Sequence, residues 1–165
     1  MNRKAYIGVV LGALAVLLLA VNVTIYQREN LLSEGQTVML ALAPVDPRSL
    51  MQGDYMALRF EVARQVGKTE ATDGYVVVKR DARNVATFNR VYRDGETMAV
   101  DESRIHYRLR RNDVRIVTNA YFFQEGTAAA YATARFGELR VADNGVALLV
   151  AMRDKDLKVV GGLKK

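Results

Sequence analysis

The most constraining feature of the chain is an uncharged apolar segment near its N-terminus. No charged residue occurs from Ala5 to Tyr26, and residues 7–21 are all apolar or glycine. Because an α-helix rises about 1.5 Å per residue, about 20 such residues cross a hydrocarbon core about 30 Å thick. The segment therefore predicts a membrane-spanning helix and leaves the rest of the chain to form a separate domain.

Arg3 and Lys4 precede this segment, and basic residues tend to stay on the cytoplasmic side of a membrane. The chain is thus predicted to cross a membrane once, with its N-terminus in the cytoplasm and its C-terminal domain outside. A cleaved signal peptide is the alternative, with Leu18 and Ala20 suited to a cleavage site. Residues 22–26 extend the segment beyond a usual signal sequence, which favours an uncleaved anchor. Both alternatives export the domain.

The polar residues 27–35 end in Gly35 and are typical of a helix that continues and then stops. We therefore assign residues 1–35 to a basic tip, an anchor helix and a connector, and residues 36–165 to one extracytoplasmic domain. The chain has no cysteine, so this domain must be stabilised by its hydrophobic core. About 130 residues bury enough apolar surface for that purpose.

Beyond Gly35 the hydrophobic pattern mostly has a period of two, which is typical of strands. In residues 55–62, Met56, Leu58, Phe60 and Val62 share one face, and we expect that face to be buried. Further strands are predicted at 36–43, 75–78, 88–92, 104–110, 114–117, 139–141, 146–152 and 157–160. Together they predict a mainly β, antiparallel domain resembling a small barrel or a sandwich.

Two local signals complete the predicted fold. The alanine-rich residues 127–134 predict one short helix, with Thr127 as its N-cap. Asn144-Gly145 is the strongest two-residue hairpin signal in the chain, and it predicts a tight turn between the strands at 139–141 and 146–152.

The stretch from Gly53 to Phe60 places turn residues directly before a strand. Gly53 supplies the backbone freedom of a turn, and the carboxylate of Asp54 can accept backbone hydrogen bonds there. The Tyr55 ring is expected to pack, while Leu58 faces the core. Upstream, Asp46 before Pro47 is a second turn signal. A structural role for these residues is favoured over a catalytic one.

Signals for a metal or a cofactor are poor. The chain has one histidine, His106, and no metal-binding, P-loop or dinucleotide-binding motif. We therefore predict neither a metal nor a cofactor.

An envelope hydrolase is the rival hypothesis, and it would use Ser49, Asp54 or Glu125. Two carboxylates brought together can divide the acid and base roles. Gly53-Asp54 is also similar to the Gly-Asp of exported signal peptidases, but that alignment puts Val45 at the position of their nucleophile. This mismatch argues against peptidase activity.

A row of basic residues marks the strand at 104–110. Arg104, His106, Arg108 and Arg110 fall on one side by the period of two, and Arg111 and Arg115 follow nearby. Guanidinium groups spaced about 7 Å apart suit phosphate or carboxylate recognition. The alternatives are a solvated face and internal pairing with acids.

The chain carries a formal net charge of +6. Outside the membrane, such a charge favours lipid headgroups, anionic wall polymers or an acidic protein patch as a partner, and not nucleic acid.

The motif residues resemble the bacterial GDYXXLXY family. The resemblance rests on residues 45–50, on Gly53-Asp54-Tyr55 with Leu58, and on later stretches at 122–126, 134–138 and 145–150. It spans about residues 36–152, with Phe60 where the family has its final tyrosine. It implies a membrane-anchored extracytoplasmic bacterial protein, of a kind encoded beside polytopic membrane proteins, and it implies no established activity.

Taken together, these features predict a non-enzymatic accessory subunit. The helix tethers the β-rich domain to the inner membrane, and the domain docks on a polytopic membrane protein or an anionic envelope component.

Overall fold

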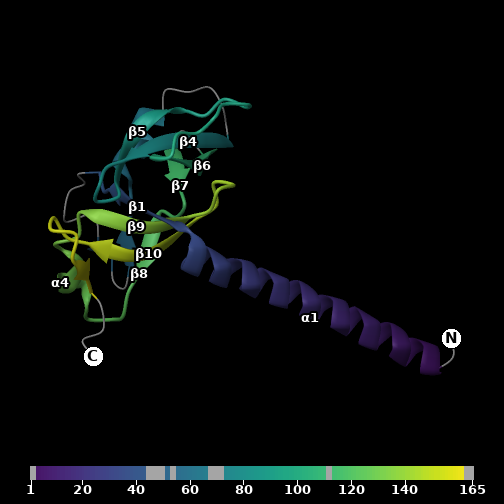
Figure 1. Cartoon of the computed structure of the whole chain (residues 1–165). Helices are drawn as coiled ribbons and strands as arrows, with labels where there is room; N and C mark the ends of the chain where they lie inside the picture. The colour runs from purple at the N-terminus through teal and green to yellow at the C-terminus, as the bar shows by residue number, and fades with distance from the viewer. Residues whose placement is uncertain (1–2, 44–50, 53–54, 67–72, 111–112, 162–165) are drawn as a thin grey trace. The chain divides into compact units, whose positions relative to one another are not determined.

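The computed structural model describes residues 3–43, 51–52, 55–66, 73–110 and 113–161 (Figure 1). The chain divides into two compact units, residues 1–34 and residues 35–165.

The first unit is helix α1, Arg3–Glu34. Residues 7–34 are long and apolar enough to cross a membrane, as the sequence predicts. The Asn22 side chain donates to the Leu18 carbonyl at 2.8 Å, and the Thr24 hydroxyl donates to the Ala20 carbonyl at 2.9 Å. Because these polar groups are satisfied within the helix, they cost less in an apolar surrounding. The helix ends at Glu34, directly before Gly35, as predicted.

The second unit is mainly β, which confirms the predicted fold class. Its larger sheet has eight strands in the order β11-β10-β9-β1-β5-β4-β6-β7. The strands are β1 (Gln36–Ala41), β4 (Asp73–Arg80), β5 (Val85–Val91), β6 (Glu102–Arg110), β7 (Asp113–Ile116), β9 (Phe136–Val141), β10 (Ala147–Arg153) and β11 (Val159–Val160).

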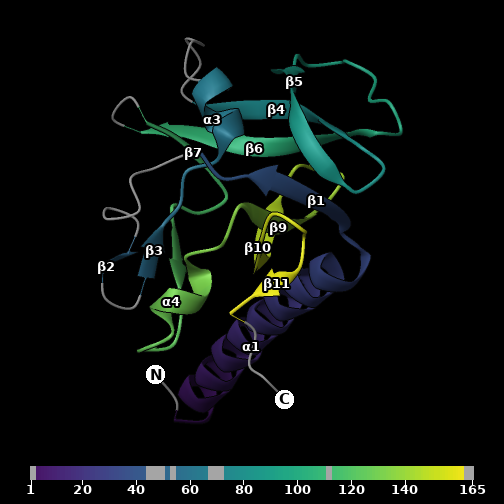
Figure 2. The ribbon, with the colours of Figure 1, turned by 90° about the vertical axis from the view of Figure 1, so that its left-hand side faces the viewer.

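All neighbours in this sheet are antiparallel except β1 and β5, which pair in parallel with Met39 opposite Val85. In Figure 2, β1 lies between β4, β5 and β6 above it and β9, β10 and β11 below it. The parallel pair was not predicted, because period-two patterns give no information about strand direction.

A smaller sheet has the order β2-β3-β8, from β2 (Met51–Gln52), β3 (Tyr55–Ala57) and β8 (Ala120–Phe122). Among the described residues the domain also has the short helices α3 (Glu61–Val66) and α4 (Ala128–Tyr131).

The predicted single strand at 55–62 is wrong beyond Ala57. Phe60 forms only an isolated bridge with Leu42, and helix α3 begins at Glu61. The predicted core face nevertheless holds, because Met56, Leu58, Phe60 and Val62 are all buried. The reason is that the segment crosses between two hydrophobic clusters, so that every second side chain is buried although the strand has ended.

Those two clusters form the core of the domain. Phe60 and Val62 pack in the larger cluster, with Val38, Leu40 and Leu139, between the strands of the eight-stranded sheet and α3. Met56 and Leu58 pack in the smaller one, with Tyr131, Ala134 and Met152.

Two turn predictions need correction. Thr127 precedes α4 but makes no side-chain cap, because its hydroxyl donates backwards to the Gln124 carbonyl at 2.6 Å. The β9–β10 hairpin forms at Asn144-Gly145, but its loop has three residues. Ala142 and Val146 close the loop, and Gly145 alone has a positive φ, of 86°. A three-residue loop that ends in a left-handed glycine is the next most common hairpin type.

Candidate functional site

Strand β6 carries the basic row as the period of two predicts. Ser103, Ile105 and Tyr107 are buried, whereas Arg104, His106, Arg108 and Arg110 lie on the other face with intermediate or full exposure. Burial raises the pKa of the Tyr107 hydroxyl, and nearby Asp73 adds to this effect. The basic face is therefore backed by a buried, mostly apolar face of the same strand.

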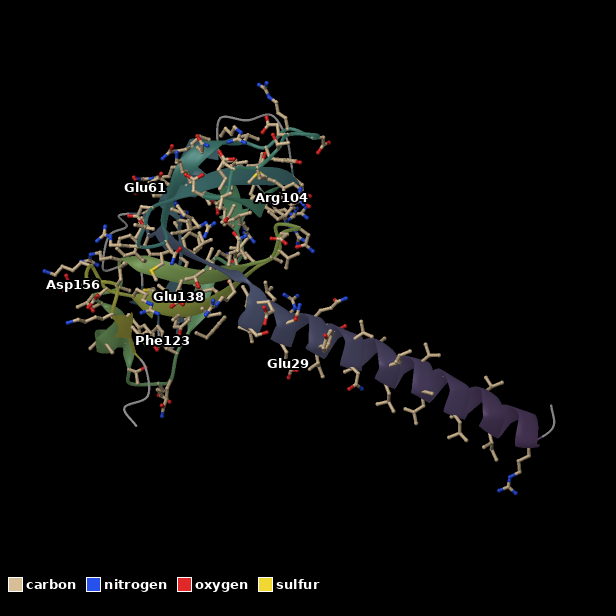
Figure 3. The ribbon with its side chains drawn as sticks, viewed as in Figure 1. Glu29, Glu61, Arg104, Phe123, Glu138 and Asp156 are labelled. Atoms are coloured by element: carbon tan, nitrogen blue, oxygen red, sulfur yellow. The ribbon has the colours of Figure 1, made fainter. Side chains whose placement is uncertain are left out.

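Arg104 is held at one end of this row. Its guanidinium carbon lies 5.5 Å from the centre of the Tyr75 ring and 5.4 Å from that of Tyr92, within the range of cation–π contact. Its Nε donates to the Asp143 carbonyl at 2.8 Å. Figure 3 labels Arg104 on the upper strands of the sheet. This arginine is therefore positioned by aromatic rings and by the β9–β10 turn.

The same turn packs against β6. The His106 amide donates to the Gly145 carbonyl at 3.0 Å, and the His106 ring lies 5.3 Å from the Tyr75 ring. A Cβ at Gly145 would lie 2.7 Å from Tyr75, so glycine is required both by this approach and by the positive φ. The turn thus ties β9 and β10 to a strand that is not their neighbour in the sheet.

Arg108, Arg110 and Arg115 form the exposed part of the basic face, and we call them the arginine group. All three are exposed, and within the described part of the chain none of them forms a salt bridge. Arg108 lies opposite Arg115 of β7, with Asp73 of β4 on its other side. Like charges directly opposite repel each other, so a bound anion would stabilise this arrangement.

Glu102, at the start of β6, shows the contrasting arrangement. Both of its carboxylate oxygens accept from Arg90, whose Nε also donates to Glu96 at 2.9 Å. These hydrogen bonds, together with one from the Ala99 amide, lower the pKa of Glu102 to about 2. The sheet therefore neutralises Arg90 internally, whereas the arginine group forms no such ion pair with any residue that the structure describes.

This network predicts a specific acid dependence. The folded-state pKa of Glu102 is depressed from 4.5 to about 2, so the unfolded chain binds more protons between these values. The contribution of Glu102 to stability is complete above pH 4.5 and is lost as the pH falls towards 2. We expect Glu102→Gln to flatten the fall of the urea midpoint over this range. A Glu125→Gln control should keep the wild-type slope, and equal slopes for all three proteins would contradict the prediction.

A cavity of about 340 Å³ lies beside the start of β6. It is lined by Gln36, Met98, Ala99, Val100, Glu102, Ser103, Arg104, Ala142 and Asp143. Its serine donates to the Gln36 side chain at 2.9 Å, and its glutamate is bound by Arg90. Ser103 and His106 lie on opposite faces of β6, so they cannot form a nucleophile and base pair.

The structure describes some of the motif residues that the sequence singled out, but not all of them. Tyr55 lies on β3 with its ring 5.8 Å from that of Phe122, and Leu58 is buried. Glu125 is exposed in the turn after β8. The predicted positions Asp46, Pro47, Ser49, Gly53, Asp54 and Arg111 lie outside the described residues. Within the described ranges, no group of three or more potential ligands could hold a metal ion.

Sequence reasoning missed the buried ion pair between Glu138 and Arg153. Glu138 lies on β9, labelled in Figure 3, and its Oε2 accepts from Arg153 Nε at 2.7 Å. The available signal was a single acid between Gly137 and Leu139, directly before the strand predicted at 139–141. Tyr75 and Tyr92 were missed as partners of Arg104, since contacts between separate strands leave no mark in local sequence.

The family model described as GDYXXLXY protein matches residues 17–152, which include part of α1 and most of the domain. No curated protein and no solved structure matches the chain.

Proposed function

Because the chain belongs to the GDYXXLXY protein family and begins with an apolar helix of membrane-spanning length, we propose that it is a membrane-anchored accessory subunit. Its extracytoplasmic domain docks on an acidic face of a polytopic protein in the same bacterial inner membrane. The domain contributes binding and not catalysis.

The observation that carries this proposal is the arginine group. Arg108, Arg110 and Arg115 are exposed on two adjacent strands, whereas Lys79 and Arg90 on neighbouring strands are paired with acids. Arginine is suited to recognising carboxylates because its planar guanidinium offers several donors in a fixed geometry. An acidic protein patch would neutralise the repulsion between Arg108 and Arg115.

The membrane topology supports the same function. Arg3 and Lys4 precede the apolar segment, which favours a cytoplasmic N-terminus and a domain on the outer face. A helix that stays attached confines the domain to two dimensions beside other membrane proteins. This confinement raises the effective concentration of a partner, so that even a small charged surface suffices for docking.

The docking surface can be tested by charge reversal. We expect Arg108→Glu with Arg110→Glu to reduce recovery of the partner, in co-purification from mild detergent, by at least about tenfold, because like charges across an interface cost several kcal/mol. The matched control is Arg64→Glu with Arg93→Glu, which changes the net charge equally at two other exposed arginines. This control should recover the partner as the wild type does.

Three results would count against this function. Equal recovery with both double variants would remove the arginine group as the docking surface. Recovery of an anionic wall polymer in place of a protein would overturn the class of partner. Normal recovery together with loss of function in Glu125→Ala would favour the hydrolase hypothesis.

A further inference from the structure

The connection between the two units is very short. Helix α1 ends at Glu34 and β1 begins at Gln36, so that one residue separates them. The uncharged segment ends near Tyr26, and residues 27–34 add about 12 Å of helix at about 1.5 Å per residue. The headgroup layer on each side of a bilayer is about 5–8 Å thick. If α1 spans the membrane, as the proposed function requires, chain connectivity keeps the start of β1 close to the headgroups.

Two loops of the domain surround the start of β1. Gln36 lies opposite Val141 of β9 and accepts a hydrogen bond from Ser103 of β6 at 2.9 Å. It lines the same cavity as Val100 of the β5–β6 loop and Asp143 of the β9–β10 turn. Both loops therefore lie at the end of the domain at which the tether enters.

The side chains at this end suit a lipid surface. Val100, in the β5–β6 loop, is 97% exposed, and Val146, which closes the β9–β10 loop, is 42% exposed. Exposed apolar side chains such as these gain free energy by entering the headgroup boundary. Arg140 lies close to the point at which the tether enters, with its Nη1 donating to the Gly35 carbonyl at 3.2 Å and to the Thr37 hydroxyl at 2.7 Å. Asp101, in the same loop, is neutralised by Lys79 at 3.4 Å.

We propose that the β5–β6 loop at Val100 and the β9–β10 turn at Val146 contact the lipid headgroup layer of the membrane that α1 spans. The partner of these two loops is thus the bilayer. Their contact with it fixes which end of the domain faces the membrane.

This orientation has a consequence for the arginine group. Strand β6 begins beside Gln36 and leads away from it, and Arg110 lies seven residues beyond Ser103. At about 3.3 Å per residue, that is about 23 Å along the strand. Arg108 and Arg110 would therefore face a protein that extends beyond the headgroup layer, and not the lipid itself.

The absence of cysteine allows a direct test with single labels. Val100→Cys, Val146→Cys and the control Val159→Cys would each carry an environment-sensitive fluorophore in the full chain. The chain would be reconstituted in phosphatidylethanolamine and phosphatidylglycerol vesicles that contain a headgroup quencher. Val159 is a matched control because it is 52% exposed and pairs with Arg153, at the end of β9 opposite to Gln36. We expect several-fold stronger quenching at positions 100 and 146 than at position 159.

Flotation of the same vesicles separates the two proposals. A chain that floats but is quenched equally at positions 100 and 159 would overturn the lipid contact and leave the docking function standing. A chain that does not float would overturn both, because the lipid contact rests on the anchor. Flotation with the expected quenching, combined with full partner recovery in the Arg108→Glu, Arg110→Glu variant, would support the lipid contact and contradict the docking surface.

Discussion

The Phe60→Ala variant is expected to lose about 3–5 kcal/mol of unfolding free energy. Phe60 is 2% exposed and packs in the larger core cluster. Its ring fills the space left by the missing side chain of Gly137, where a Cβ would lie 2.8 Å from the Phe60 Cε1 atom. Truncation therefore leaves a cavity between β9 and the segment before α3, and the packed strands around it cannot collapse to fill it.

Urea denaturation followed by circular dichroism would measure this loss. Phe60→Leu is a milder control, which should cost less because it keeps most of the buried volume. Phe60→Tyr restores the last tyrosine of the family motif. We expect it to cost about 1–3 kcal/mol, because its hydroxyl would enter an apolar site directed towards β9. A loss below about 1 kcal/mol in Phe60→Ala would show that the site is not part of the core.

The Arg153→Met variant is expected to lose about 3 kcal/mol, since it leaves the Glu138 carboxylate buried without a counter-ion. The side chain of Glu138 is only 9% exposed, whereas that of Arg153 is 24% exposed. This partial access to water places the expected loss at the low end of the range for a broken buried pair. Arg153 also donates from Nη1 to the Leu157 carbonyl at 2.7 Å, so the turn before β11 should loosen as well.

The double variant Glu138→Met, Arg153→Met separates the two contributions. It removes both charges, so it should be more stable than Arg153→Met alone, because no unpaired charge stays buried. Hydrogen exchange of residues 154–158 would report the loss of the Leu157 contact in both variants. If the double variant were less stable than the single one, the cost of the single change would not arise from the unpaired Glu138.

Local pattern predicted much of the fold. The period of two in residues 104–110 and the burial of Met56, Leu58, Phe60 and Val62 follow from side-chain spacing, and the end of the helix before Gly35 follows from the glycine stop signal. The prediction that the strand extends to Val62 is wrong, because a buried side chain does not require its backbone to be paired in a sheet. Phe60 is buried at an isolated bridge, and Val62 is buried in the short helix α3. The predicted Thr127 cap is also wrong, because the Thr127 hydroxyl donates to the Gln124 carbonyl and makes no hydrogen bond to the start of α4.

From the sequence, the candidate site could be predicted only as a row of basic residues on one face of a strand. The spacing of Arg104, Arg108 and Arg110 placed them on one face, and β6 has that face. Nothing in the spacing distinguished Arg104, which is held between Tyr75 and Tyr92, from the exposed Arg108 and Arg110. That difference depends on which strands lie beside β6 and on how far each position is from the β9–β10 turn.

By itself, the sequence determined that an apolar helix precedes a cysteine-free, strand-rich domain of the GDYXXLXY family. Those properties depend on composition and on the spacing of apolar residues within a few positions. Each short segment therefore partitions between water, lipid and the protein core according to its own side chains. Only the tertiary structure decided that β1 and β5 run in parallel, that Glu138 meets Arg153, and that the loops at Val100 and Asp143 border the start of β1. These contacts join residues far apart in the chain, and they form only when burial of a shared core offsets the entropy of closing the loops between them.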